Sequence, residues 1–162
     1  MIVVTGAAGF IGSIVLAELN KKGNNDLILV DDFSKQNKER NYIDAKYNEL
    51  IDRDYYFDWF ENNHDNVEFV IHLGARTDTT EFDWSVFEKL NVSFTQKMFG
   101  LCAEYNIPLK VHFSLHTPID SVRKELIPAA NMNIEDCIDS LDSKIPLQPI
   151  VDCEICEFPE DA

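Results

Sequence analysis

The sequence is poor in basic residues and lacks long apolar runs. Lysine and arginine number 14 among 162 residues, against 29 aspartates and glutamates, so the formal net charge is −15 at pH 7. This acidic excess disfavours a broad surface for nucleic acid. The longest apolar runs, such as Leu27 to Val30, fall far short of the ~20 residues that a membrane span requires. We therefore expect neither a nucleic-acid nor a membrane partner.

The sequence has few cysteines. It also does not begin with a basic segment followed by an apolar core, the pattern of a secretory signal. The four cysteines include the pair Cys153 and Cys156 near the C-terminus. A structural zinc site usually needs four ligands, typically from two such pairs. We therefore predict no metal site, and we expect reduced thiols in a cytoplasmic protein.

Glycine and proline are distributed unevenly along the chain. All six glycines lie at or before Gly100, whereas five of the six prolines follow residue 110. Residues 111–162 carry a net charge of −8, about half of the total. This change predicts a boundary, with one domain over 1–110 and a separate acidic segment over 111–162. The segment is either fused to the domain or a divergent end of it.

Apolar periodicity predicts alternating strands and helices in the first domain. We expect strands over 2–4, 27–30, 67–72 and 107–115, and helices over 11–22, 54–62 and 83–105. This order is typical of an α/β fold with a Rossmann-type, doubly wound parallel sheet, although with fewer elements than such folds usually contain. We expect the aromatic side chains of the longest helix, including Trp84 and Phe94, to lie in the core.

Three glycines at regular spacing join the first predicted strand to the first predicted helix. Gly6, Gly9 and Gly12 follow the pattern G-x-x-G-x-x-G. In this context Gly6 permits a tight turn, Gly9 lets a pyrophosphate approach the backbone, and Gly12 lets the helix pack closely. The backbone N–H groups of the helix N-terminus would then bind the anion. The pattern predicts a dinucleotide site.

An acidic residue ends the second predicted strand. Asp31 follows Gly12 by 19 residues, where a carboxylate would accept hydrogen bonds from the adenosine ribose. An acid at this position disfavours the 2′-phosphate of NADP. Lys38 and Arg53 lie nearby in sequence, however, and either could pair with that phosphate. The residues alone leave both NADP and NAD open as the cofactor.

Several motifs together resemble the extended short-chain dehydrogenase/reductase superfamily, and within it the ADP-glyceromanno-heptose 6-epimerases of lipopolysaccharide core synthesis. The glycine pattern is shared by the whole superfamily, whereas His72 to Ala75 combined with Thr79 to Glu81 is much narrower. The resemblance covers residues 1–109 and implies the cofactor-binding half of an NAD(P)-dependent nucleotide-sugar epimerase. An ADP-linked sugar would be a substrate only if the missing half were supplied.

The resemblance also implies roles for further residues. Phe10 and Ile11 would touch the cofactor phosphates, and Asp32 would join Asp31 near the adenosine ribose. Lys38 and Arg53 would lie where this family places basic residues for the 2′-phosphate. A second group would line the cofactor beyond the strand 67–72 or support the site from the following helix, namely Leu73, Gly74, Ala75, Thr77 and Asn91.

The catalytic pair of this superfamily is not found where it is expected. The resemblance implies a Tyr-x-x-x-Lys motif well after the strand 107–115, but the last tyrosine is Tyr105. Tyr42 and Lys46 have the right spacing but lie on the adenosine side, and we interpret them as surface residues. Ser114 has no partner. We therefore assign no catalytic residue, and a non-catalytic dinucleotide-binding module is the alternative function.

Residues 113–141 are similar to a segment of the radical-SAM adenine C2 methyltransferases that act on RNA. That family needs a Cys-x-x-x-Cys-x-x-Cys motif for its iron–sulfur cluster, and this chain contains no such motif. The similarity therefore implies no methyltransferase activity, but it is consistent with a join near residue 110.

Overall fold

The computed structural model describes residues 1–78, 80–108, 119–126, 133 and 135–136. The chain divides into two compact units, residues 1–109 and 110–162. Several residues named in the sequence analysis lie outside the described residues, namely Thr79, Ser114, Cys153, Cys156 and most of the segment 113–141. The origin of residues 111–162, fused or divergent, stays a prediction.

A parallel sheet forms the centre of the first unit, as the sequence predicted. Its described strands are β1 (Ile2–Thr5), β2 (Leu27–Asp31), β3 (Glu49–Asp52) and β4 (Phe69–His72), in the order β3-β2-β1-β4. In the register, Ile2 pairs with Leu27 of β2 and with Phe69 of β4. The switch in order at β1 is the Rossmann-type arrangement, in which a crevice opens at the carboxyl ends of the strands.

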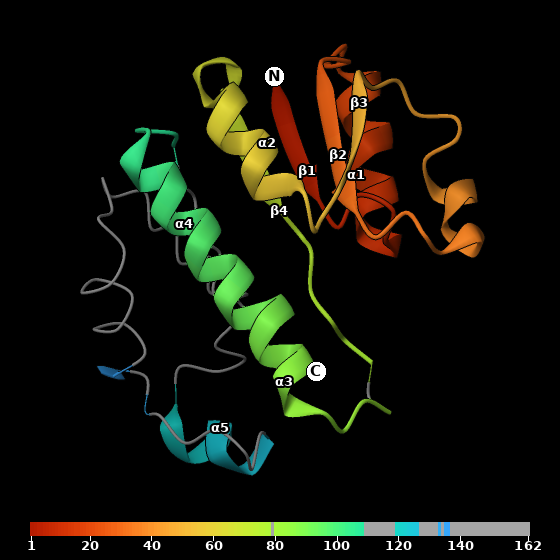
Figure 1. The fold of residues 1–162 in the computed structure, drawn as a ribbon. Coiled ribbons are helices and arrows are strands. Elements are labelled where there is room, and N and C mark those ends of the chain that lie inside the picture. Colours follow the sequence, from red (N-terminus) through yellow and green to blue (C-terminus); the bar gives the residue numbers. More distant parts are fainter. Residues whose placement is uncertain (79, 109–118, 127–132, 134, 137–162) are drawn as a thin grey trace, which may run out of the picture. The chain divides into compact units, whose positions relative to one another are not determined.

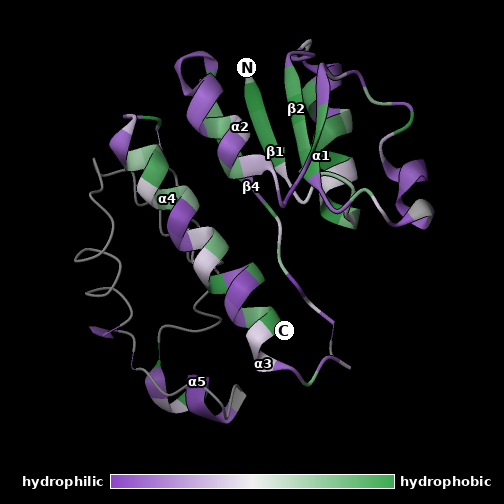
Figure 2. Cartoon of the chain, in the orientation of Figure 1, coloured by the Kyte–Doolittle hydropathy of each residue, from purple (hydrophilic) through white to green (hydrophobic). Residues whose placement is uncertain are grey.

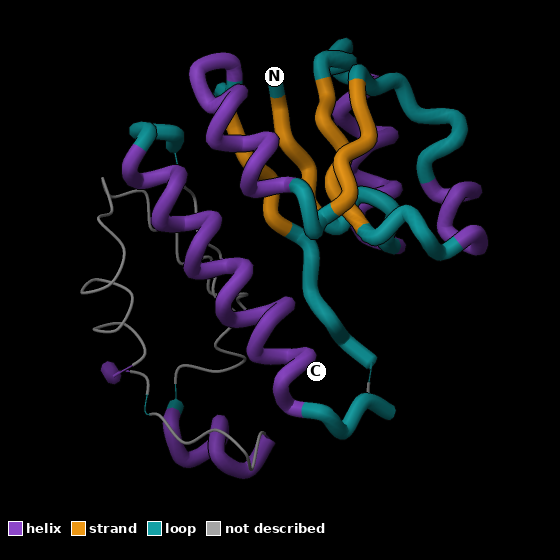
Figure 3. Tube along the Cα trace, viewed as in Figure 1, coloured by secondary structure: helices purple, strands orange, loops and turns teal. Residues whose placement is uncertain are grey.

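Helices cover both faces of this sheet (Figures 1 and 3). Alternate residues of β1 point to opposite faces, because side chains alternate along a strand. Val3 lies in a core with α2 (Tyr56–Asn63) and the long helix that ends with α4 (Phe94–Glu104). Val4 lies in a core with Leu16 of α1 (Phe10–Lys21). The strands β1 and β2 are apolar along most of their length (Figure 2), as expected for a sheet buried on both faces.

The strand β3 was not predicted from the sequence. The sequence analysis predicts no element between the strand 27–30 and the helix 54–62, whereas the structure has a 3₁₀ helix η1 (Gln36–Asn41) and then β3. Only Ile51 is buried among the four residues of β3. A short strand at a sheet edge needs few apolar residues, so its hydropathy pattern resembles that of a loop.

The helix predicted over 83–105 is present but is not regular. It consists of α3 (Trp84–Phe87), a π-helical segment η3 (Glu88–Ser93) and α4. Asp83 caps the start, where its side chain accepts the Ser85 N–H. Phe94 packs against the core, but the expectation for Trp84 was wrong, because this side chain is 72% exposed.

The second unit contains the helix α5 (Asp120–Leu126). Among the residues that the structure describes, none of the helices combines the length and the apolar character needed to cross a bilayer.

Candidate nucleotide-binding cleft

The glycine turn between β1 and α1 is tight and is fixed by backbone hydrogen bonds. Gly6 has φ +68°, and its N–H donates to the Val30 carbonyl oxygen at 2.8 Å. The Gly9 N–H donates to the Gly6 carbonyl oxygen at 3.0 Å. A Cβ atom on Gly6 would lie 2.7 Å from the backbone nitrogen of Gly74. The turn therefore has the conformation predicted for Gly6.

The first turn of α1 opens directly onto this glycine turn. Its N-cap residue is Gly9, with no side-chain cap and no acidic residue in the first turn. The N–H groups at the start of a helix have no intrahelical acceptor, so an uncapped start is suited to an anion. The side chains of Phe10 and Ile11 are mostly exposed. Any contact of these residues with phosphate would come from the backbone.

Gly12 lies in close contact with the backbone of the glycine turn. A Cβ atom here would overlap the carbonyl oxygen of Gly6 and lie 2.7 Å from that of Ala7. At Gly12 the helix thus packs directly on the backbone of the turn.

Asp31 lies at the end of β2 and is nearly buried. Its Oδ2 accepts the Ala8 N–H at 2.9 Å, which ties β2 to the glycine turn. Its Oδ1 accepts the Asp32 N–H at 2.7 Å and pairs with the Lys38 ammonium at 2.5 Å. Both carboxylate oxygens are therefore already engaged by groups of the chain.

Asp32 gathers two more cations beside this pair. Its carboxylate lies 3.5 Å from the Arg53 guanidinium and 3.9 Å from the Lys35 ammonium. The Ser34 hydroxyl donates to it at 2.5 Å, and this hydrogen bond, with smaller effects of the two cations, holds the pKa of Asp32 below its usual value. The structure thus brings the predicted Lys38 and Arg53 to one end of the cleft and adds Lys35.

The segment after β4 forms the opposite wall. Gly74 N–H donates to Thr5 Oγ1 at 3.3 Å, which holds this segment beside the glycine turn. Asn91, in the π-helical segment, accepts the Arg76 N–H at 2.6 Å and donates to the Arg76 carbonyl oxygen at 2.9 Å. The side chain of Asn91 therefore supports the wall from outside the cleft.

A partly buried histidine connects the two walls to the helix behind them. His72 Nδ1 lies 2.6 Å from Thr5 Oγ1, and its Nε2 lies 3.0 Å from Thr95 Oγ1. Burial lowers the pKa of His72, so the neutral ring is favoured. The sequence analysis assigned no role to this residue.

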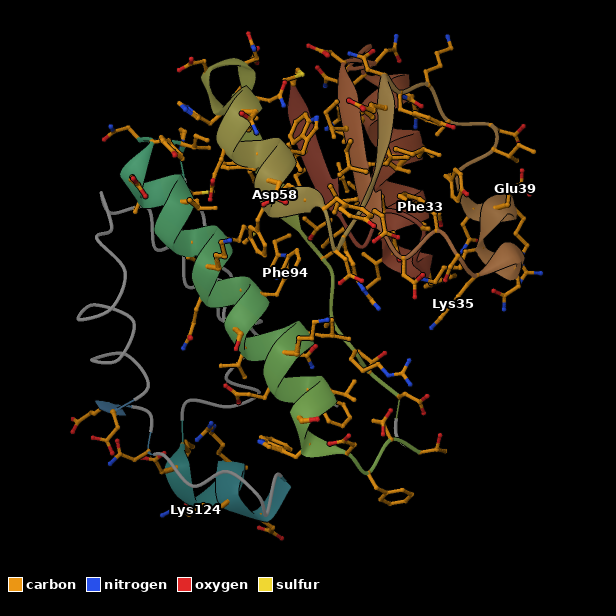
Figure 4. The ribbon with its side chains drawn as sticks, in the orientation of Figure 1. Phe33, Lys35, Glu39, Asp58, Phe94 and Lys124 are labelled. Atoms are coloured by element: carbon orange, nitrogen blue, oxygen red, sulfur yellow. The ribbon has the colours of Figure 1, made fainter. Side chains whose placement is uncertain are left out.

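These walls enclose a cleft of about 170 Å³. Five of its lining residues are charged, four of them basic, on a chain whose net charge is −15. Eight predicted residues line it: Gly6, Gly9, Asp31, Lys38, Arg53, Leu73, Gly74 and Ala75. Six others were missed by the sequence analysis: Thr5, Val30, Lys35, Arg76, Leu90 and Phe94. Figure 4 shows Lys35 on the loop after β2 and Phe94 on α4.

The remaining predicted residues lie around the cleft rather than in its lining: Phe10, Ile11, Gly12, Asp32, Thr77 and Asn91. Lys35 is near Asp31 in sequence and Arg76 is near Gly74, so both could have been predicted as lining residues on this ground. Nothing in the pattern distinguished Leu90 or Phe94 from ordinary core positions.

Tyr42 and Lys46 lie outside the cleft lining. The Tyr42 ring is partly exposed and packs edge-on against Phe33, with 5.2 Å between the ring centroids. Burial, with a smaller effect of Glu39, raises the pKa of Tyr42. A tyrosine that acts as a base needs the opposite shift.

The strand order and the glycine turn define a Rossmann-type α/β protein. A family model described as "NAD dependent epimerase/dehydratase family" matches residues 2–124, which is most of the chain and extends past residue 110. The chain therefore belongs to the NAD-dependent epimerase/dehydratase family.

Curated relatives add a narrower similarity. The chain is 40% identical over 109 residues to the ADP-L-glycero-D-manno-heptose-6-epimerase of Fusobacterium nucleatum, covering 66% of this chain and 33% of the relative. It is 37% identical over 110 residues to that of Alkalilimnicola ehrlichii, covering 67% and 34%. The chain thus spans about a third of the length of these relatives.

Solved structures support the fold. The Helicobacter pylori ADP-L-glycero-D-manno-heptose-6-epimerase aligns with a TM-score of 0.58 and 20% identity, covering 70% of this chain and 39% of that one. The Bacillus cereus UDP-glucuronic acid 4-epimerase in complex with NAD aligns with a TM-score of 0.55 and 24% identity, covering 70% and 40%.

Proposed function

We propose that this chain binds a nicotinamide dinucleotide, NADP or NAD, with the pyrophosphate over the glycine turn. The observation that carries this proposal is the uncapped start of α1 beside Gly9, in a cleft where four of the five charged lining residues are basic. A pyrophosphate supplies the acceptors that the free N–H groups lack and complements the positive charge. The nicotinamide would supply hydride transfer when bound, and the chain's own residues would position it.

The cations around Asp31 and Asp32 favour NADP over NAD. Lys38 pairs with Oδ1 of Asp31 and so offsets the negative charge that would repel a 2′-phosphate, while Oδ2 already accepts the Ala8 N–H. The Nε of Arg53 is buried and has no hydrogen-bond partner among the described residues. A 2′-phosphate would give this guanidinium an acceptor and would neutralise the surrounding cations. The family description, which names NAD, supports the alternative cofactor.

The chain would serve as the cofactor-binding part of a nucleotide-sugar epimerase that resembles the ADP-heptose 6-epimerases. The identity to two such relatives supports this proposal. An ADP-linked sugar would bind only with the parts of those enzymes that this chain does not match. A dinucleotide-binding module without chemistry is the alternative that the missing Tyr-x-x-x-Lys motif favours.

Replacing Gly9 with valine tests dinucleotide binding directly. A Cβ atom at Gly9 would lie 3.1 Å from the Gly6 carbonyl oxygen, a contact that small shifts can relieve, so the variant should fold. The branched side chain would occupy the place of the pyrophosphate. We expect at least a tenfold loss of NADP and NAD affinity by calorimetry, or about 1.4 kcal/mol.

Gly100→Val is the matched control, because Gly100 is exposed in α4 and a Cβ there has no neighbour within 4 Å among the described residues. Equal affinities in Gly9→Val, Gly100→Val and the wild type would refute the proposed binding site.

Cofactor preference should depend on the charges around β2. Asp31→Asn removes a negative charge and should raise the ratio of NADP to NAD affinity about tenfold. The double variant Lys38→Ala, Arg53→Ala should lower the ratio by a similar factor. The exposed Asp44→Asn is the control and should leave the ratio unchanged. If neither cleft variant changes the ratio, the 2′-phosphate does not bind here.

A further inference from the structure

Arg76 lies in the cleft wall opposite Lys38 and Arg53. The backbone of Gly74 packs on Gly6, where an added Cβ atom would lie 2.8 Å from Gly74 Cα. Two residues further along, Arg76 lines the same cleft as Gly6 and Gly9. Its side chain is therefore positioned beside the glycine turn, on the β4 side of β1, whereas Asp31 marks the β2 side.

The guanidinium of Arg76 is held by one nitrogen. Its Nη2 pairs with Asp78 at 2.9 Å and with Glu81 at 3.4 Å. The Thr80 hydroxyl and N–H also donate to Asp78 and hold the pKa of this carboxyl below its usual value, so Asp78 stays ionised. These ion pairs fix the direction in which the side chain points.

The Nε–H of Arg76 is left without an acceptor. This atom is buried and has no hydrogen-bond partner among the residues that the structure describes. A buried donor without an acceptor is costly, because it has lost its hydrogen bonds to water. The fixed planar guanidinium therefore offers a donor in a cleft suited to an anion.

The backbone of Arg76 is fixed as firmly as its side chain. Asn91 makes hydrogen bonds with both its N–H and its carbonyl oxygen. Asn91 belongs to the π-helical segment η3, and such segments frequently occur at functional sites. Leu90, its neighbour, lines the cleft. Two elements thus hold one residue in place, which is the arrangement expected of a binding group.

We infer that Arg76 is a phosphate-binding residue. Its Nε–H donates to the second of the two phosphates of the dinucleotide, the one farther from the adenosine. This inference rests on the proposed function and deepens it. The adenosine would lie toward Asp31 and Lys38, and the chain of the dinucleotide would cross the glycine turn toward β4. Arg76 would then meet the second phosphate, opposite the N-terminus of α1.

The test compares two nucleotides that differ by one phosphate, ADP and AMP. Calorimetry gives both dissociation constants for the wild type, Arg76→Gln and Arg76→Lys. We expect Arg76→Gln to weaken ADP about tenfold and AMP less than about twofold, since one charged hydrogen bond is lost. Arg76→Lys keeps the charge but lacks the planar fork, so it should show a smaller loss for ADP.

The ratio of the two affinities protects the test against partial unfolding, because a smaller folded fraction weakens both nucleotides by the same factor. Arg40→Gln, an exposed arginine outside the cleft lining, is the matched control for charge. An unchanged ratio in Arg76→Gln would overturn the inference and leave the proposed function standing. A wild-type chain that binds neither nucleotide would overturn the proposed function, and the inference with it.

Discussion

Replacing Gly6 with alanine should lower the free energy of unfolding by about 2–5 kcal/mol and abolish nucleotide binding. The left-handed backbone conformation, with φ +68°, costs any L side chain ~1–2 kcal/mol. The new methyl group would also lie within 2.8 Å of backbone atoms of Leu73 and Gly74, which cannot rotate away as a side chain can. Overpacking of this kind adds ~1–3 kcal/mol.

The chain provides its own control for the conformational part of this cost. Gly23 also has positive φ, +88°, but an added Cβ atom there has no neighbour within 4 Å in the part of the chain that the structure describes. Gly23→Ala should therefore lose only ~1–2 kcal/mol in urea denaturation and retain nucleotide binding. Equal losses in the two variants would show that Gly6 and Gly74 do not pack as described.

Phe60→Ala should destabilise the chain by about 3–5 kcal/mol, the usual cost of removing a buried aromatic ring. Phe60 is fully buried and packs against Tyr56 at a centroid distance of 5.6 Å and against Tyr105 at 6.2 Å. These rings help to join α2 and α4 on one face of the sheet, so the cavity would loosen the support of the β4 wall.

Phe82→Ala removes the same group from a position that is 93% exposed. Its unfolding free energy should stay within about 0.5 kcal/mol of the wild type. A loss below ~1.5 kcal/mol in Phe60→Ala, measured in the same denaturation series, would contradict the described packing of this core.

The glycine turn and the buried strands could be predicted because local chemistry determines them. Positive φ at Gly6 and the close approach at Gly12 both require the absence of a side chain. The π-helical segment η3 could not be predicted in this way. A π turn uses more residues than an α turn, so the apolar period before Ser93 falls out of phase with the period after it. This shift accounts for the exposure of Trp84 on a helix predicted to be regular.

The charges of the cleft were predictable only in part, for a similar reason. Lys38 and Arg53 were indicated by nearness to Asp31 and by the resemblance. Nearness could also have suggested Lys35 and Arg76, but whether these side chains reach the cleft depends on loops whose paths are set by tertiary contacts. Arg76 is held by Asn91, a contact across 15 residues of sequence. No periodicity encodes such a contact, because loops follow the elements that they connect rather than a repeat of their own.

The pairing of β4 with β1 has a consequence for local opening of the fold. Ile2 pairs with Phe69 across 67 residues, whereas β1 and β2 partners are only 25 residues apart. If β4 separated from β1, Gly74 would leave Gly6 and the cleft would lose one wall, while β1 and β2 could remain joined. A nucleotide that bridges the walls binds only the closed form. It would therefore slow hydrogen exchange at β4 amides more than at those shared by β1 and β2.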